Sequence, residues 1–245
     1  MCAIPFTRMT EVGRVRAIYR YPVKSMAGEA LASAQLGWHG LDGDRRLAFV
    51  RSGVRAGMPW LTAGRLASLV TYIPLRDAED ALPTRVRTPK GEELDLHGDA
   101  LRAELTSAHG APVELMRIDN GIFDDGALSI ITTSAVAAVS GEAGVHADAR
   151  RFRPNLLIET PGRSPFPEDA WVGRTLRIGE GEQPPAVSVC LRDVRCAMMN
   201  LDPDTAASDA RFLKAAVRMN ENCAGVYATT IRTGPVRVGD ALYLA

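Results

Sequence analysis

Alternating apolar and polar residues predict the first strand of the chain. Between Val15 and Val23 the odd-numbered positions are apolar and arginines occupy several of the even ones, which is the period of a half-buried strand. Further runs rich in β-forming residues are separated by Gly, Pro and Asp clusters. In the first half these predicted strands are Leu47–Val50, Leu69–Ile73, Arg85–Thr88 and Val113–Ile118. This half predicts a small antiparallel barrel or sandwich with one helix near residues 99–108.

The second half mixes short helices with strands. A helix is predicted over Ala135–Ser140, and a clearer one begins at Ser208, a residue placed to cap its N-terminus. In the second helix Phe212 and Val217 belong to one apolar face. The predicted strands are Leu156–Glu159, Thr175–Ile178, Val187–Cys190, Gly225–Arg232 and Val236–Leu244. The whole pattern indicates a mixed α/β, mostly β fold, in two halves that meet near residues 110–120.

Composition and charge narrow the class of partner. The 29 basic and 29 acidic residues cancel, and no long Lys/Arg run is present. The pattern therefore favours neither a nucleic acid nor an anionic membrane surface as partner. No stretch approaches the roughly 18 uncharged apolar residues of a membrane span, and the first residues contain no apolar signal core. We expect a soluble, cytoplasmic protein.

The cysteines and histidines are sparse. Cys2, Cys190, Cys196 and Cys223 are too few for a disulfide scaffold in a chain of 245 residues, and reduced thiols in a cytoplasm fit best. The four histidines are scattered without the spacing of a zinc site. A structural zinc ion is not expected.

Cys196 is the first candidate for chemistry. It follows Arg195 and shortly precedes the turn-forming segment Asp202-Pro203-Asp204. A flanking cation favours the thiolate, which is the form of cysteine that binds metals or attacks as a nucleophile. Taken alone, a cysteine in such a sequence is more often a small buried apolar side chain.

Three groups of polar residues are candidates for binding an anion. They are Lys24 and Ser25 after the first strand, Thr132, Thr133 and Ser134 before a helix, and Arg153, Pro154 and Asn155 before a strand. A lysine with a hydroxyl, a helix N-terminus and a planar guanidinium each suit a phosphate. The alternatives are a solvated loop, an ordinary helix N-cap and polar groups flanking a strand.

Six short motifs occur in an order that resembles a known family. They are Tyr21-Pro22-Val23-Lys24-Ser25, Asp44-Arg45, Phe152-Arg153-Pro154-Asn155, Glu168-Asp169-Ala170-Trp171, Arg195-Cys196 and Asp202-Pro203-Asp204-Thr205. The chain thereby resembles proteins with a MOSC domain preceded by its N-terminal β-barrel partner, and most of all the mitochondrial amidoxime-reducing component and its bacterial relatives. The resemblance implies an N-terminal β-barrel domain at residues 12–115 packed on a β-rich MOSC domain at residues 116–245.

The resemblance also implies a cofactor and its contacts. In such proteins the cysteine of the Arg-Cys pair binds the molybdenum of molybdenum-molybdopterin, and this position maps onto Cys196. The residues around the pterin and its phosphate map onto Lys24, Ser25, Arg45, Thr132, Thr133, Ser134, Arg153, Pro154, Asn155 and Arg195. Cys190 is expected to be structural.

The function implied is reduction of N-hydroxylated compounds, such as amidoximes, hydroxylamines or N-hydroxylated bases, by removal of oxygen from an N–O bond. The chain ends at Ala245, directly after its last predicted strand. A separate ferredoxin- or cytochrome-type protein is therefore expected to supply electrons. Two alternatives stay open: a persulfide carrier that uses Cys196, and a protein that binds or hands over the cofactor without turnover.

Overall fold

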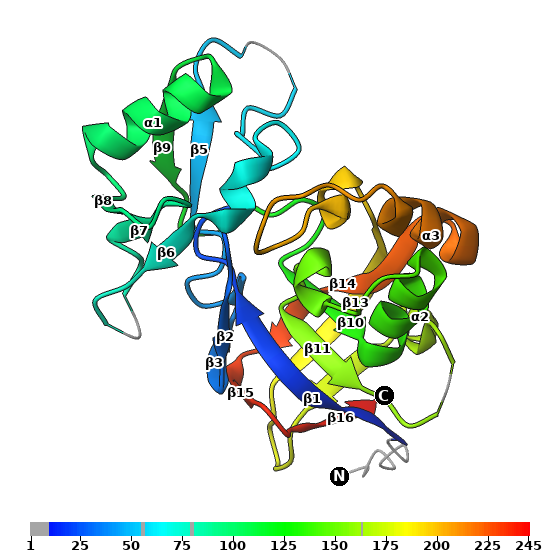
Figure 1. Cartoon of the computed structure of the whole chain (residues 1–245). Coiled ribbons are helices and arrows are strands. Elements are labelled where there is room, and N and C mark those ends of the chain that lie inside the picture. The colour runs from blue at the N-terminus through cyan, green and yellow to red at the C-terminus, as the bar shows by residue number, and fades with distance from the viewer. Residues whose placement is uncertain (1–9, 55–56, 79–80, 163) are drawn as a thin grey trace.

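The polypeptide is built around a closed barrel of seven strands (Figure 1). The computed structural model describes residues 10–54, 57–78, 81–162 and 164–245. The barrel closes where the first strand pairs with β11, and the only parallel pairing among the described strands is between β10 and β11. In order around the barrel the strands are β1 (Thr10–Arg20), β11 (Leu156–Glu159), β10 (Leu128–Thr132), β14 (Cys223–Arg232), β13 (Ala186–Val194), β12 (Thr175–Ile178) and β16 (Ala241–Leu244).

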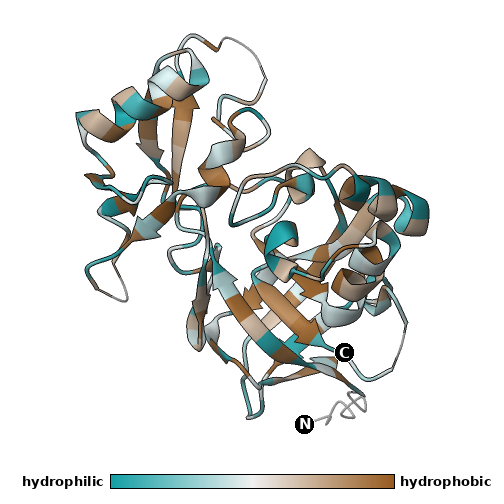
Figure 2. Ribbon diagram, in the orientation of Figure 1, coloured by the Kyte–Doolittle hydropathy of each residue, from teal (hydrophilic) through white to brown (hydrophobic). Residues whose placement is uncertain are grey.

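Aliphatic side chains fill the barrel. Along β10 they alternate, so that Ile130 points into the barrel core and Ile131 points outward. A register shift between Val15 and Ala17 of β1 keeps both Val15 and Ile18 in the same core although they lie three positions apart. The apolar strands appear brown in Figure 2. The first strand, β1, thus contributes to a barrel core whose other strands all come from the second half of the chain.

Two helices cover the outer face of the barrel at β10, β11 and β14. They are α2 (Thr133–Ala143) and α3 (Arg211–Asn220), which pack on each other and on Ile131, Leu157 and Ala224. Short 3₁₀ turns lie nearby at η2 (Ala149–Phe152), η3 (Pro167–Trp171) and η4 (Ala197–Asn200). The two helices therefore pack on the outer face of β10, β11 and β14. Polar residues near the ends of these and other barrel strands are described below.

The predicted start of the last helix was wrong. Ser208 forms a bridge with Leu201 instead of capping, and the helix begins at Arg211, whose N–H donates to Asp209 Oδ1 at 3.0 Å. Val217 is also outside the buried face, with 53% of its surface exposed. Because Ser208 has an extended backbone in this bridge, the helix starts three residues later.

A smaller unit is formed by residues 47–117. Its hydrophobic cluster contains, among others, Leu47, Leu69, Leu101 and Val113. Its elements are β5 (Leu47–Arg51), η1 (Ala67–Thr71), β6 (Ile73–Leu75), β7 (Arg85–Arg87), β8 (Glu93–Asp95), α1 (Asp99–His109) and β9 (Val113–Arg117). β5 pairs with β9, and β6, β7 and β8 form a second small sheet. The unit stands beside one end of the barrel (Figure 1).

Two predicted strands differ in the structure. Residues 69–71 lie in the 3₁₀ turn η1, because a turn can bury the consecutive residues Leu69 and Val70 on one side, whereas a strand would place them on opposite faces. The last predicted strand is divided into β15 (Gly234–Arg237) and β16. The division occurs at a turn where Gly239 has a φ of 95° and Asp240 Oδ2 accepts the Arg237 N–H at 2.7 Å.

The remaining strands pack on the barrel, whose core takes Leu36, Leu41 and Val236 from them. They are β2 (Glu29–Leu31), which pairs with β1, and β3 (Ser33–Gly37), which pairs with β4 (Gly40–Leu41) and β15. The predicted fold class, mostly β with a few short helices, is confirmed. The boundary between residues 115 and 116 stays a prediction, since the barrel core takes Val15 and Leu36 from before it and Leu128 from after it.

None of the helices in the described ranges combines the length and the apolar character needed to cross a lipid bilayer.

Candidate functional site

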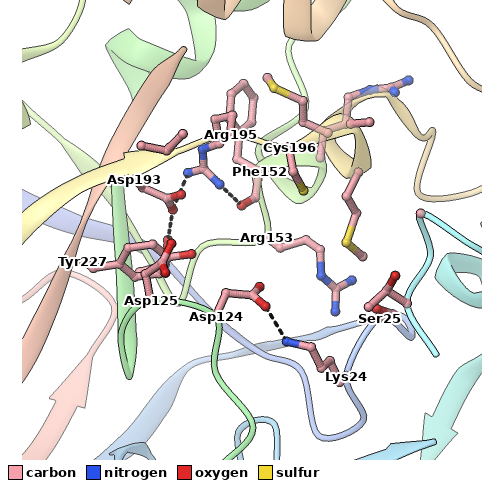
Figure 3. A pocket seen from close by; sticks show the side chains of 18 of the residues that line it. Lys24, Ser25, Asp124, Asp125, Phe152, Arg153, Asp193, Arg195, Cys196 and Tyr227 are labelled. Carbon is pink, nitrogen blue, oxygen red and sulfur yellow. Dashed lines mark hydrogen bonds and ion pairs between the residues drawn. The ribbon is translucent and has the colours of Figure 1, made fainter. Parts of the chain in front are cut away.

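A cavity of about 480 Å³ lies where the smaller unit meets the end of the barrel (Figure 3). Met58, Thr62 and Gly64 line it from the smaller unit. The barrel side contributes Lys24, Ser25, Arg45, Asp124, Asp125, Ser129, Arg151, Phe152, Arg153, Asp193, Val194, Arg195, Cys196, Ala197, Met198, Met199 and Tyr227. Its volume is in the range of pockets that hold a small molecule or cofactor, roughly 300–1,000 Å³. The cavity brings Lys24, Ser25, Arg45, Arg153, Arg195 and Cys196 together, and their contact with a cofactor stays a prediction.

Lys24 lies just after β1, where the backbone leaves the barrel. The Lys24 N–H donates to the Leu47 carbonyl at 2.7 Å, and Ser25 takes up a left-handed φ of 69°. The lysine side chain is 6% exposed, and its Nζ donates to Asp124 Oδ1 at 2.7 Å. Burial lowers the pKa of Lys24, and the Asp124 carboxylate opposes this effect. Asp124 itself is 56% exposed, so only the lysine of this ion pair is buried.

Arg153 lines the cavity and carries a buried donor without a partner among the described residues. It follows η2 in a left-handed conformation, its Nη1 donates to the Met26 carbonyl at 2.7 Å, and its guanidinium stacks on the Tyr21 ring at 4.2 Å. Its Nη2 is buried and has no hydrogen-bond partner in the described part of the chain. Burial lowers the pKa of Arg153 to about 10, with a further contribution from the neighbouring Arg45 cation. A buried guanidinium that keeps one donor without a partner is costly unless a ligand, best of all an anion, joins that donor.

Arg195 contacts only other parts of the protein. Its Nε donates to the Ala224 carbonyl and its Nη1 to the Phe152 carbonyl, each at 2.7 Å, and its Nη2 lies 2.9 Å from Asp193 Oδ2. Arg45 behaves similarly, because Asp44 and the Arg153 carbonyl take its donors at 2.5 and 3.0 Å. Both arginines therefore brace the cavity wall.

Cys196 carries the exposed thiol of the cavity. β13 ends at Val194, and Cys196 directly precedes η4, so its side chain leaves the sheet at the cavity. Cys190 lies on β13 away from the cavity, with its Sγ 3.4 Å from the Ser188 carbonyl. No group of three or more His, Cys, Asp or Glu side chains in the described ranges could hold a metal ion. A metal at Cys196 would thus take its other ligands from a non-protein group.

Several predicted contacts lie outside the cavity. Thr132 caps α2 by accepting the Ala135 N–H at 3.1 Å and donates to Glu168 Oε2 at 2.7 Å, while Thr133 and Ser134 form the first turn of that helix. They match the ordinary N-cap alternative. Pro154 and Asn155 are buried beside the cavity without lining it.

Asn155 joins three parts of the chain. Its Oδ1 accepts the Ser129 N–H at 3.0 Å, and its Nδ2 donates to the Tyr19 carbonyl at 3.3 Å. With an exposure of 1%, the side chain supports the cavity from behind.

Sequence reasoning missed the acidic side of the cavity. Asp124, Asp193 and Tyr227 line it, and Ser129 Oγ donates to Asp193 Oδ2 at 3.1 Å. A signal for Asp193 was present: an aspartate at the end of an apolar strand, three residues before the candidate thiol. Asp124 lies in an irregular segment between β9 and β10, where no periodic pattern places a side chain.

Comparisons with known proteins agree with this architecture. The model of the MOSC N-terminal beta barrel domain matches residues 12–119, and that of the MOSC domain matches residues 105–243. No curated protein matches. The YUAD protein from Bacillus subtilis is similar in fold, with a TM-score of 0.53 and 12% identity over 96% of this chain and 97% of that chain.

A further solved structure shares only part of the chain. YiiM from Geobacillus stearothermophilus is 16% identical over 49% of this chain and 55% of that chain, with a TM-score of 0.36. The two family models together span almost the whole chain. The protein therefore belongs to the MOSC-domain family, which is associated in general with the molybdenum cofactor, and it carries the family's N-terminal β-barrel domain.

Proposed function

We propose that this protein is a molybdenum-cofactor-dependent oxidoreductase that reduces N-hydroxylated compounds at the cavity beside Cys196. The observation that carries the proposal is the presence, on one cavity, of an exposed thiol and a buried guanidinium donor without a partner. A cofactor that contains both a thiophilic metal and a phosphate would satisfy the two at once.

The residues present fit that cofactor. Arg153 and Lys24 supply cations for the phosphate, and the Ser25 hydroxyl lies next to them on the cavity wall. Arg45 and Arg195 would brace the cavity wall and Asn155 would support it from behind, because their donors already contact other parts of the protein. Of the contacts that the sequence predicts, the direct ones in this proposal are therefore those of Lys24, Ser25 and Arg153.

When bound, the cofactor supplies a sulfur-rich molybdenum suited to two-electron oxygen-atom transfer. The chain's own part is to hold the metal through the Cys196 thiolate and to orient the phosphate with Lys24 and Arg153. Met58 and Thr62 of the smaller unit would face the substrate from the opposite wall. Amidoximes, hydroxylamines and N-hydroxylated bases are the proposed substrates.

The proposal includes a partner and a place in the cell. Electrons would come from a separate ferredoxin- or cytochrome-type protein. A cytoplasmic location is supported by the cysteines, because Cys190, Cys196 and Cys223 are all unpaired thiols.

Cys196→Ser tests the proposal, since it keeps the size of the side chain and replaces a soft thiolate with a poor ligand. With a chemical reductant, wild-type protein should reduce benzamidoxime or hydroxylamine. The variant should lose this activity by about 100-fold or more while retaining most of its pterin.

Cys190→Ser is the matched control, because that thiol is also exposed but lies away from the cavity. It should remain active. Cyanide-releasable sulfur on Cys196, together with no N–O reduction by wild-type protein, would instead establish the persulfide carrier. Near-normal turnover by Cys196→Ser would remove the thiolate from the mechanism.

A further inference from the structure

We propose that Asp193 is the proton donor to the leaving oxygen of the substrate, an assignment that rests on the proposed function. No cofactor contact is assigned to this residue. It lies at the end of β13, in the cavity wall, three positions before Cys196 (Figure 3). The residue is 2% exposed, so its carboxyl group is shielded from bulk water although the residue lines the cavity.

The reaction needs a proton source at this place. For an amidoxime, two electrons and two protons break the N–O bond, the oxygen leaves as water, and the nitrogen retains one of the protons. The electrons come from the external electron-transfer protein, or from dithionite in the assay. A positioned acid makes the departure of the oxygen easier, typically by a factor of about 100 to 10,000. The acid then regains its proton from water in the cavity.

The other acidic groups of the cavity are less suitable. Asp124 forms the ion pair with Lys24, and its side chain is 56% exposed. Asp125 is also exposed. Burial raises the pKa of Tyr227 far above neutrality, which makes the phenol a weak acid in that position. Asp193 is the carboxyl group that is both buried and part of the cavity wall.

The surroundings of Asp193 hold its carboxyl group in one place. Ser129 Oγ on β10 donates to Oδ2, and Arg195 Nη2 lies 2.9 Å from the same oxygen. The charged or titratable groups around it are Arg195, Arg45, Asp124, Cys223 and Tyr227. No hydrogen bond within the described ranges occupies Oδ1, which leaves this oxygen for a substrate.

Burial raises the pKa of Asp193, while Arg195 and Ser129 oppose the shift without cancelling it. The direction keeps a proton on this carboxyl at a higher pH than on an ordinary aspartate. Since the protonated form is the donor, the rate should fall as the pH rises through the pKa of Asp193. Loss of the carboxyl should remove that part of the pH profile.

Asp193→Asn is the variant to make, because an amide oxygen can still accept from Arg195 and Ser129 but the group cannot donate an acidic proton. Arg195 also keeps its bonds to the Ala224 and Phe152 carbonyls, so the Cys196 loop should stay in place. We expect kcat for benzamidoxime to fall about 100-fold and the alkaline decline to disappear. Molybdenum and pterin contents should match those of the wild type.

Glu168→Gln is the matched control. Glu168 is also fully buried, also accepts from a hydroxyl, at 2.7 Å from Thr132, and burial also raises its pKa, but it lies outside the cavity. Its substitution should leave both kcat and the pH profile unchanged. A fall in both variants would attribute the effect to disturbance of the barrel and overturn the assignment.

Infrared spectroscopy gives a readout that does not need turnover. The band of a protonated carboxylic acid should disappear with rising pH in wild-type protein and in Glu168→Gln, and that titrating component should be missing in Asp193→Asn. If wild-type protein reduces benzamidoxime and Asp193→Asn does so at the same rate with the same pH profile, the inference fails alone. If wild-type protein reduces no N–O bond, the proposed function fails with it.

Discussion

Two arginines of the cavity wall, Arg153 and Arg195, show how similar sequence signals acquire different roles. Arg153 keeps a buried Nη2 without a partner, whereas the Nε, Nη1 and Nη2 of Arg195 all contact the protein. Both are arginines of family motifs, and both line the cavity. The difference shows that ligand binding is better inferred from unused donors than from the presence of a cation.

The largest expected effect is on the stability of the two arginine variants. Arg195→Met should lower the free energy of unfolding by about 3–5 kcal/mol, because the Asp193 carboxyl and the Ala224 and Phe152 carbonyls all lose their donor, at about 1–3 kcal/mol each. Chemical denaturation of the cofactor-free protein measures this quantity. The Arg195→Met protein that remains folded should still bind pterin. An unfolding curve identical to that of the wild type would show that the contacts of Arg195 do not stabilise the fold.

Arg153→Met should have the opposite profile. We expect pterin retention to weaken by roughly 10- to 100-fold, the loss of a charge-assisted contact worth about 1.5–3 kcal/mol. The cofactor-free protein should keep its stability, since removal of the unpaired Nη2 offsets the loss of the Met26 hydrogen bond and of the stacking on Tyr21. Equilibrium binding of released cofactor, beside an unfolding curve, measures both effects.

The smallest effect belongs to the hydroxyl groups at the start of α2. Thr133→Ala and Ser134→Ala should leave pterin retention unchanged within about 0.5 kcal/mol, because neither residue lines the cavity. The same binding assay applies. A loss comparable to that of Arg153→Met would return these hydroxyls to the cofactor site.

The sequence predicts local elements well where a single period continues. The strands at residues 156–159 and 175–178 have the predicted bounds, because each is a short apolar run between clear turn residues. Leu69 and Val70 were misread as strand, since consecutive apolar residues fit a buried turn as well as a strand. Periodicity also could not show that β1 closes a barrel with β11, about 140 residues further along the chain.

At the site, the motifs located most of the cavity but not the role of each side chain. Lys24, Arg153 and Cys196 lie together because the ends of separate barrel strands converge there, and this is information about topology. The same local pattern of a hydroxyl before a helix becomes a cap at Thr132, where Glu168 approaches from a distant segment. Whether a donor is free depends on such distant partners, which the local sequence does not reveal.

The most direct test of this account is the metal and pterin content of the full-length protein purified from a molybdenum-sufficient host. A cavity with an exposed thiol and a buried guanidinium donor without a partner should retain a tightly bound cofactor, so we predict about one molybdenum and one pterin per chain. Less than about a tenth of that amount, when other molybdenum enzymes of the same host are fully loaded, would contradict the account.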